Sequence, residues 1–442
     1  MMKILFIYHN INTKNIRHLP LGLSILSGIL KEHGHEVKLL YLQEAISDGA
    51  LLGYVGEYDP GVIGFSTGTL QWPETVRLAR TIKSVFKAPV VCGGPHPTFM
   101  PEEVISEPSV DMLCIGEGEY AMLDIVRRLE TGGDMASIPN VWVKNQEGRV
   151  FRNGVRDLVE NLDSLPFPDR SILPYQDIIN ESKTEPVFIT SRGCPYNCTF
   201  CSNSAIKKIY KGKGRYVRQR TPENVIAEIG FLKSRYAFET LNFYDEAFGF
   251  NREWNRRFCE IYEKEFSMPF GAFIRAETVD RESFRIMKRA GLALIYLGVE
   301  SGNEEIRRKV MNRKVSNETI INTCRDAQAE GIQVWTFNIV GVPGETVSTI
   351  QETMALNRII NPHFASVSIY QPFPGTAMYD ECVANHYIEK DYKTNLYEDS
   401  VLNLKTIQHH ELLEGFRQFQ ELSNQMKEAH EKRGDRIFLV DL

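Results

Sequence analysis

Short apolar runs rich in β-branched residues alternate with amphipathic stretches along most of this chain, in two consecutive series. Compact apolar runs bounded by turn residues are typical of buried strands, whereas apolar positions with a 3.6-residue period are typical of helices. Strand–helix alternation at this spacing predicts an α/β fold with parallel sheets covered by helices. The chain has 442 residues, so we expect more than one domain.

The first series predicts a doubly wound parallel sheet, a Rossmann-like domain over residues 1–154. Its expected strands are Lys3–Tyr8, Glu36–Tyr41, Gly61–Ser66, Pro89–Cys92 and Asp111–Ile115, and its expected helices are Gly22–His33, Trp72–Phe86 and Glu119–Leu129. Such sheets bind ligands at the carboxyl ends of their strands. Turns of small residues fall at three of those ends: Ser66-Thr67-Gly68-Thr69, Gly93-Gly94-Pro95-His96-Pro97-Thr98 and Gly116-Glu117-Gly118. They indicate close approach of a large flat ligand, although tight strand-to-helix turns would have the same composition.

Residues 155–186 contain Pro166, Pro168, Pro174 and Pro186 and lack periodicity, which predicts a helix-free linker. The second series, residues 187–379, predicts six βα units, fewer than the eight of a closed barrel, and therefore a partial barrel. Its expected strands are Val187–Thr190, Thr240–Tyr244, Phe270–Ile274, Leu292–Val299, Val334–Val340 and Ala365–Tyr370. Its expected helices are Pro222–Ser234, Arg252–Phe266, Arg281–Ala290, Asn317–Gly331 and Thr346–Ile360. Residues 380–442 predict a short helical extension, with its strongest helix at His409–Lys432.

Composition excludes several classes of protein. The formal net charge of −6 provides no global basic field for nucleic acid. The longest apolar runs are far shorter than the ~20 residues of a membrane span, and the start lacks a signal-peptide cleavage pattern. Eight cysteines are too few for a disulfide scaffold in a chain of this length. We therefore expect a cytoplasmic protein with no nucleic-acid partner and no membrane span.

Three cysteines, Cys194, Cys198 and Cys201, form a C-x3-C-x2-C cluster after the first expected strand of the second series. Three thiolates on one loop can hold three irons of a 4Fe–4S cluster, which leaves the fourth iron open to a small molecule with an amino and a carboxylate group. A zinc site usually needs a fourth Cys or His nearby, and His9 and His96 are distant in sequence. The spacing favours iron–sulfur over zinc or incidental cysteines.

From Pro186 to about Tyr379, the sequence resembles the radical S-adenosylmethionine (SAM) superfamily, with this cysteine motif after the first strand of a six-unit partial barrel. The resemblance implies that SAM binds the open iron and is cleaved to a 5′-deoxyadenosyl radical. It also implies that Phe200 packs near adenine, Asp245 and Glu246 meet the methionine ammonium, and Arg275 meets the carboxylate. Glu300 and Ser301 would bind the ribose, and Val340 and Gly341 the adenine. The alternative for each is a satisfied polar group or a tight turn at a strand end.

The amino-terminal stretches PLGLSILSGILKEHGHEV, GFSTGT, CGGPHPTF and IGEGE resemble the cobalamin-binding domain of the cobalamin-dependent radical SAM enzymes. This resemblance implies that cobalamin binds at Ser66, Thr67, Gly68, Thr69, Gly93, Gly94, His96, Pro97, Thr98, Gly116, Glu117 and Gly118. The D-x-H-x-x-G motif that supplies a histidine to cobalt elsewhere is absent. We therefore expect base-off cobalt with no imidazole below it, and Thr69 to Trp72 as candidates for that face. His96 is expected to bond the corrin periphery or cap a turn.

The resemblances imply a cobalamin-dependent methyltransferase that acts on an unactivated carbon through the 5′-deoxyadenosyl radical and methylcobalamin. The alternative is a cobalamin-binding radical SAM enzyme that catalyses ring formation, ring contraction or oxidation; a non-catalytic sensor is a third hypothesis. Expected partners are a small-molecule, natural-product or lipid substrate and an electron donor such as flavodoxin or ferredoxin. The basic residues between Lys207 and Arg220 form either a solvated loop or a docking rim. No catalytic residue toward the substrate is assigned.

Overall fold

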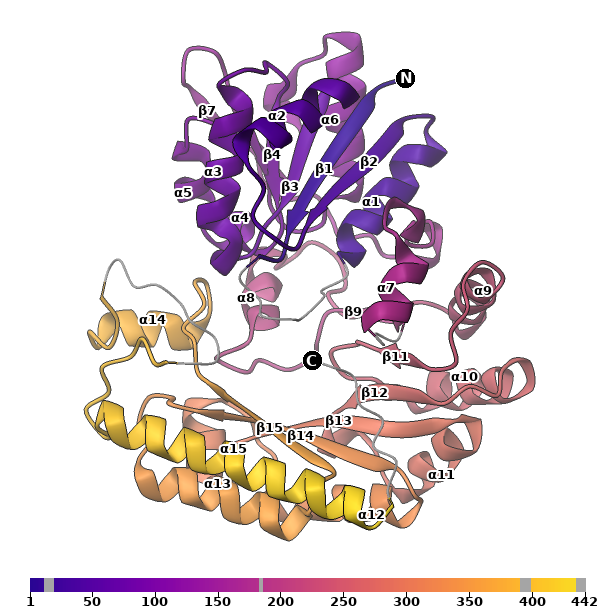
Figure 1. Ribbon diagram of the computed structural model, residues 1–442, viewed down its shortest axis with the longest axis vertical. Helices are drawn as coiled ribbons and strands as arrows, with labels where there is room; N and C mark the ends of the chain where they lie inside the picture. The colour runs from indigo at the N-terminus through magenta and orange to yellow at the C-terminus, as the bar shows by residue number, and fades with distance from the viewer. Residues whose placement is uncertain (12–19, 183–185, 390–398, 435–442) are drawn as a thin grey trace. The chain divides into compact units, whose positions relative to one another are not determined.

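The computed structural model describes residues 1–11, 20–182, 186–389 and 399–434, and these residues divide into two compact units. Unit 1 comprises the described residues up to 182 together with Lys208–Arg215. Unit 2 comprises the other described residues from 186 onward. Figure 1 labels the helices and strands of both units.

Unit 1 is built on a seven-stranded sheet in the order β2-β1-β3-β4-β5-β6-β7. Its strands are β1 (Lys3–His9), β2 (Glu36–Leu42), β3 (Val62–Ser66), β4 (Val90–Gly93), β5 (Met112–Cys114), β6 (Val141–Lys144) and β7 (Val150–Arg152). Strands β1 to β5 pair in parallel, which confirms the predicted doubly wound sheet. The antiparallel β6 and β7 were not expected. Their hairpin turn is fixed by Asn145, which accepts from two backbone N–H groups, and by Gly148 at φ +81°.

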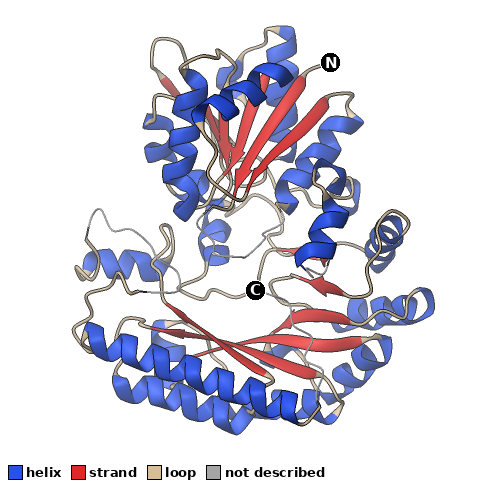
Figure 2. Cartoon of the chain, viewed as in Figure 1, coloured by secondary structure: helices blue, strands red, loops and turns tan. Residues whose placement is uncertain are grey.

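Successive side chains of a strand point to opposite faces of the sheet, and in these strands the side chains on both faces are apolar. Helices therefore cover both faces of the sheet (Figure 2). In β1, Ile4 and Phe6 join the core under α1 and α6, whereas Leu5 and Ile7 join the core under α2, α3 and α5. The helices are α1 (Leu21–Glu32), α2 (Asp48–Tyr58), α3 (Trp72–Lys83), α4 (Pro95–Phe99), α5 (Pro101–Ser106) and α6 (Glu119–Thr131).

The expectation of a helix-free linker is wrong over α7 (Tyr175–Ser182). Pro174 directly precedes this helix. Backbone N–H groups at the start of a helix have no partner within the helix, so a proline is tolerated there. The residues before α7 also pack within unit 1: Asp169 accepts from Ser27 Oγ at 2.6 Å and pairs with Lys31 at 2.7 Å. Gly28 lies against Pro166, so the segment is held on the surface of α1.

Unit 2 contains a six-stranded parallel sheet in the order β15-β14-β13-β12-β11-β8, as expected of a partial barrel. The strands are β8 (Val187–Phe188), β11 (Leu241–Phe243), β12 (Phe270–Ile274), β13 (Leu292–Glu300), β14 (Gln333–Val340) and β15 (Phe364–Ile369). The other strands and α-helices described between residues 186 and 360 are β9 (Ser191–Arg192), β10 (Arg218–Gln219), α8 (Ser202–Ile209), α9 (Pro222–Lys233), α10 (Arg252–Glu265), α11 (Arg281–Ala290), α12 (Asn317–Ala329) and α13 (Val347–Ile360).

The carboxy-terminal residues complete unit 2. They form α14 (Ala377–Ala384) and α15 (His409–Lys432), the helix that the sequence predicted with the same bounds. Helix α15 packs against β15 and α13, and it buries Phe416 and Phe419 in the core (Figure 1). Ser423 accepts from the backbone N–H of Ala365, so polar contacts also join the helix to β15. The predicted helical extension therefore belongs to the barrel's covering layer.

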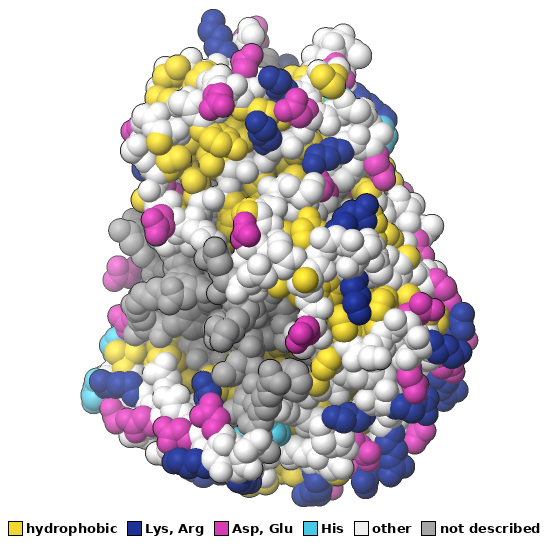
Figure 3. Space-filling view, turned by 45° about the vertical axis from the view of Figure 1, so that its right-hand side comes forward, with side chains coloured by type: hydrophobic (Ala, Val, Ile, Leu, Met, Phe, Trp, Pro, Cys, Tyr) yellow, Lys and Arg dark blue, Asp and Glu magenta, His cyan; other side chains and the backbone are white. Residues whose placement is uncertain are grey.

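Charged side chains of both signs intermix on the face of the molecule drawn in Figure 3. That face therefore carries no extended field of one sign, in keeping with the small net charge of −6. Among the residues that the structure describes, no helix is both long and apolar enough to span a bilayer.

Candidate cofactor sites

The cysteine motif lies on a loop that starts from the antiparallel pair β9–β10. Gly193 precedes the first cysteine with φ +84°, and a Cβ atom there would lie 2.4 Å from the carbonyl oxygen of Tyr216. Only glycine fits both the backbone conformation and this close approach. Further on, the N–H of Thr199 donates to the carbonyl of Met311, and the N–H of Cys201 to that of Cys198. The backbone therefore fixes the loop at both ends.

The three thiols form a mutually interacting set. Cys194 and Cys198 are buried and Cys201 is partly buried. Burial raises the pKa of the Cys194 thiol, and it raises the pKa of Cys201 to about 12, with neighbouring Cys198 among the further causes. The raised pKa values keep the Cys194 and Cys201 thiols protonated at neutral pH, so metal binding there would release protons. No three His, Cys, Asp or Glu side chains of the described residues converge as a single metal ion requires. In a 4Fe–4S cluster each thiolate binds a different iron, so this donor set fits the cluster.

Asp245 and Glu246, expected together at the methionine ammonium, have different surroundings. Asp245 is buried, and its carboxylate accepts from the backbone N–H and hydroxyl of Thr190 and from the hydroxyl of Ser191. Burial raises the pKa of Asp245 to about 6. Glu246 is exposed, and its charge raises the pKa of Cys194 and Cys201. Asp245 therefore braces the start of the cysteine loop, and Glu246 is the carboxylate that remains open near the thiols.

Arg275, expected at the SAM carboxylate, is brought to the same loop. Its Nη1 lies 3.8 Å from Sγ of Cys198, and its Nε donates to Glu277 at 2.9 Å. The guanidinium also lies over the ring of Tyr196, 3.6 Å from the centroid. Tyr196 and Glu277 were not identified from the sequence. Tyr196 lies within the cysteine motif and Glu277 lies two residues after Arg275, and these positions were the only sequence signals that pointed to them.

Glu300 ends β13 in a left-handed backbone conformation, φ +66°, where the register with β14 shifts. Burial raises its pKa, while the cations Arg313 and Arg275 act in the opposite direction. Arg313 donates to Glu300 Oε1 at 3.2 Å and to the carbonyl of Gly298 at 2.6 Å. The Nε of Arg313 is buried, and none of the described residues forms a hydrogen bond with it. A non-glycine residue in this conformation, with an unsatisfied guanidinium beside it, is typical of a site that receives a polar ligand.

Ser301, the other expected ribose contact, is fully buried. Its hydroxyl accepts from the N–H of Asn303 at 3.2 Å, and its carbonyl accepts from Arg307 Nη1. Arg307 is itself fully buried and also donates to the carbonyl of Val315 at 2.7 Å. Burial lowers the pKa of Arg307 to about 10. Arg307 thus holds the loop after β13, a role that the sequence did not reveal.

Val340 ends β14 and Gly341 follows it, whereas Phe200 lies in the cysteine loop between Cys198 and Cys201. Val340 is in the core that α15 covers, and Phe200 packs against the same cluster. Gly341 has φ +82°, and its N–H donates to the buried carboxyl of Glu345. Burial raises the pKa of Glu345 to about 8, and its Oε1 has no hydrogen-bond partner in the described part of the chain. Glu345 therefore fixes the turn after β14 through Oε2, and at neutral pH the proton on its Oε1 can be donated to a further acceptor.

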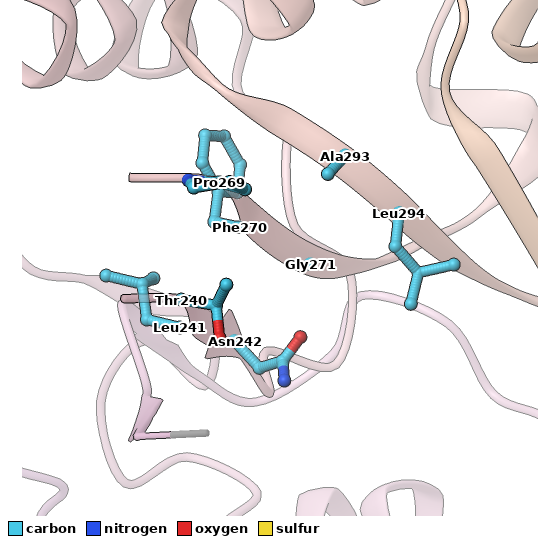
Figure 4. A pocket seen from close by; sticks show the side chains of 8 residues that line it. All are labelled: Thr240, Leu241, Asn242, Pro269, Phe270, Gly271, Ala293 and Leu294. Atoms are coloured by element: carbon cyan, nitrogen blue, oxygen red, sulfur yellow. The ribbon is translucent and has the colours of Figure 1, made fainter. Parts of the chain in front are cut away.

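The hollow in Figure 4 lies at the other end of this sheet. It is lined from the amino ends of β11, β12 and β13, by Thr240, Leu241, Asn242, Pro269, Phe270, Gly271, Ala293 and Leu294. None of the residues predicted to bind a cofactor lines it.

In unit 1, the small-residue turns after β3 and β4 pack directly on each other. Thr67 donates its N–H to Gly93, and its carbonyl accepts from the N–H of His96. Gly94 has φ +99°, and a Cβ atom there would lie 2.9 Å from the backbone of Thr67 and 3.2 Å from the hydroxyl of Ser66. The glycine at 94 is therefore required by contact between the two turns. By contrast, a Cβ atom at Gly93 would meet nothing closer than 3.9 Å.

The third turn is joined to the second by Thr98. Its hydroxyl donates to the carbonyl of Gly94 at 2.8 Å and accepts from the N–H of Gly116 at 3.0 Å. Gly116 has φ +72°, and a Cβ atom there would overlap the hydroxyl of Tyr210. That hydroxyl accepts from the N–H of Glu117 at 2.7 Å. Packing of Tyr210, which lies within the basic stretch between Lys207 and Arg220, thus accounts for the glycine at 116.

The remaining residues of these turns either begin a helix or form hydrogen bonds within the turn after β3. Pro97 is buried in α4, and Gly118 directly precedes α6 with room for a Cβ atom. Gly68 donates its N–H to Gln71 Oε1 at 2.8 Å, and Thr69 Oγ1 lies 3.4 Å from Nδ1 of His96. Gln71 also donates to the carbonyl of His9, so it ties the ends of β1 and β3 together.

His96 is buried against Trp72, with ring centroids 5.0 Å apart. Burial lowers its pKa to about 4, so the imidazole is neutral at pH 7. Its Nε2 has no hydrogen-bond partner within the described residues. His9, at the end of β1, has a buried Nδ1 to which no described residue forms a hydrogen bond, and its Nε2 lies 3.1 Å from Thr75 Oγ1. This edge thus combines hydroxyls, backbone amides and unsatisfied imidazole nitrogens, which fits a ligand fringed with amides such as a corrin.

Comparison with known proteins identifies both units. The family model of the B12 binding domain matches residues 11–126, and that of the radical SAM superfamily matches residues 188–356. The chain is 27% identical to an uncharacterized methyltransferase of Pyrococcus horikoshii over 87% of this chain and 83% of the relative. It is 26% identical to the anaerobic magnesium-protoporphyrin IX monomethyl ester cyclase of Rubrivivax gelatinosus, over 86% and 70%.

A solved structure shares the fold of this chain. The radical SAM methyltransferase TsrM of Kitasatospora setae, with cobalamin and a [4Fe-4S] cluster bound, aligns with a TM-score of 0.73 at 18% identity. The alignment covers 87% of this chain and 78% of that one, and it shows a common fold. With a B12 binding domain, a radical SAM domain and the three-cysteine loop in one chain, this protein belongs to the cobalamin-dependent radical SAM enzymes, which use a 4Fe–4S cluster, SAM and cobalamin.

Proposed function

We propose that this enzyme transfers a methyl group to an unactivated carbon of a small-molecule substrate. The observation that carries the proposal is the methyltransferase of Pyrococcus horikoshii, because its similarity extends through both domains and most of both chains. When bound, the cofactors supply a radical able to remove hydrogen from carbon and a cobalt centre that carries the methyl group.

In this proposal, unit 2 holds the cluster and SAM. Cys194, Cys198 and Cys201 bind three irons, and the loop that carries them is braced by Asp245. Glu246 is the exposed carboxylate near the thiols, and it would accept a hydrogen bond from the methionine ammonium. Glu300 would accept from the ribose hydroxyls, since Arg313 holds its carboxylate in place.

Unit 1 holds cobalamin at the carboxyl edge of its sheet. The turns after β3, β4 and β5 are joined by Thr67 and Thr98, so they form one surface that a corrin would cover. His96 lies in a stacked, buried position against Trp72 and would contact the periphery of the corrin. An electron donor such as flavodoxin or ferredoxin would reduce the cluster.

Product analysis tests the proposal. The reconstituted enzyme with its substrate should form S-adenosylhomocysteine and 5′-deoxyadenosine together. Methyl transfer would consume one SAM as the methyl donor, which leaves S-adenosylhomocysteine, and a second SAM as the source of the radical, which leaves 5′-deoxyadenosine. Replacement of Cys194, Cys198 and Cys201 by Ala should abolish 5′-deoxyadenosine, whereas Cys259→Ala and Cys382→Ala should retain it. Both control cysteines are buried on helices, Cys259 on α10 and Cys382 on α14, and lie outside the three-cysteine motif. A triple variant that still forms 5′-deoxyadenosine anaerobically contradicts the radical mechanism.

The second candidate is a ring-forming or oxidative reaction without methyl transfer. The similarity to the cyclase of Rubrivivax gelatinosus favours it, although at 70% the coverage of that relative is lower. This reaction would yield 5′-deoxyadenosine without stoichiometric S-adenosylhomocysteine, so the same assay separates the two.

A further inference from the structure

Among the three cysteines of the loop, Cys198 has a cation beside its sulfur. Nη1 of Arg275 lies 3.8 Å from Sγ of Cys198, within hydrogen-bond distance for a sulfur acceptor. The arginine side chain is 9% exposed, so water screens this contact little. A guanidinium keeps its charge at every pH at which the protein is folded.

The guanidinium is fixed from two other directions. Glu277 Oε1 accepts hydrogen bonds from Nε of Arg275 at 2.9 Å and from its Nη2 at 2.5 Å. These two bonds fix the orientation of the planar guanidinium group. The ring of Tyr196 covers its face, 3.6 Å from the ring centroid. Tyr196 is itself part of the cysteine loop, so the loop and the cation are positioned by each other.

We propose that Arg275 sets the reduction potential of the iron–sulfur cluster by donating a hydrogen bond to the Cys198 sulfur, with Glu277 moderating the effect of its charge. The inference rests on the cluster of the proposed function but is independent of what the enzyme methylates. Hydrogen bonds to the cysteine sulfurs and net charge near the cluster set its potential. Reduction adds an electron to the cluster and its thiolates, so a donor and a positive charge at Cys198 stabilise the reduced state. The carboxylate of Glu277 opposes this because it partly neutralises the guanidinium.

The test compares two substitutions with opposite expected signs. In SAM-free reconstituted protein, the potential is measured by electron paramagnetic resonance at a series of poised potentials. Arg275→Met should lower the ratio of reduced to oxidised cluster at a fixed potential by about tenfold, the size of one charge-assisted hydrogen bond. For one electron, tenfold corresponds to 59 mV. Glu277→Gln should raise that ratio, since it leaves the positive charge uncompensated. Arg275→Lys, which keeps the charge without the fork, should fall between Arg275→Met and the wild type.

The matched control is Arg281→Met, which removes an arginine that also pairs with a carboxylate, Glu330 at 2.8 Å, but is 51% exposed on α11. Its cluster potential should equal that of the wild type. An unchanged potential in Arg275→Met, or shifts of the same sign in Arg275→Met and Glu277→Gln, overturns the proposal. If Arg275→Met does not retain a cluster, the signs of Arg275→Lys and Glu277→Gln decide it. A wild type that takes up no cluster overturns the proposed function as well, and iron analysis before the measurement detects that outcome.

Discussion

Gly193→Ala should remove the cluster while leaving the rest of the protein folded. The residue next to Cys194 has φ +84°, a conformation that costs a residue with a Cβ atom about 1–2 kcal/mol. The new methyl group would also lie 2.4 Å from the carbonyl oxygen of Tyr216, far inside van der Waals contact. Relief requires movement of backbone, and overpacking of this kind costs about 1–3 kcal/mol. The loop conformation that presents the three thiols would thus be disfavoured by about 2–5 kcal/mol in total.

The assay is iron and sulfide content per chain after anaerobic reconstitution, together with thermal unfolding of the apoprotein. Gly331→Ala is the matched control, because Gly331 has φ +68° in the same unit but a Cβ atom would meet only the end of Lys288, at 3.8 Å. That variant should lose about 1–2 kcal/mol and keep a full cluster. If Gly193→Ala binds as much iron as Gly331→Ala and unfolds no earlier, the contact with Tyr216 does not shape the loop and the reasoning is refuted.

Three further predictions concern single side chains. The pKa of Asp245, about 6, lies above its ordinary value of 3.8, so the contribution of this carboxyl group to stability is present at low pH and is lost as the pH rises through about 4 to 6. In thermal unfolding, Asp245→Asn should therefore be more stable than the wild type at pH 7, by about 3 kcal/mol. At pH 3.5 the two proteins should be equally stable. Glu300→Ala should weaken SAM binding roughly tenfold to hundredfold in calorimetry, and an unchanged affinity in the folded variant would remove Glu300 from the SAM site. His96→Ala should leave the cobalt(II) magnetic-resonance spectrum unchanged, since His96 stacks on Trp72; axial nitrogen splitting that vanishes in the variant would make His96 a ligand.

The sequence by itself determined the order of elements and the chemistry of the cysteine loop. Periodicity located α11 with its observed bounds because this helix buries one apolar face. A short run of consecutive apolar residues located β12, which is buried along nearly its whole length. The three cysteines are adjacent in the chain, so their spacing was visible without a fold. The strand–helix alternation placed the glycine turns at strand ends, where the structure has them.

Tertiary structure alone decided which side chains brace these sites. Arg275 meets Cys198 across 77 residues of sequence, and Tyr210 fills the space beside Gly116 across 94 positions (210 − 116). The sequence treated Asp245 and Glu246 as one pair, whereas the structure buries the first under Thr190 and exposes the second. Helix α7 was missed because the prolines around it were taken to exclude a helix. Its packing within unit 1 depends on residues elsewhere in the chain and cannot be inferred from the spacing of its own apolar residues. Hydrogen bonds and close contacts between distant residues depend on where the backbone folds, so local patterns locate the elements of a site but not the partners that fix it.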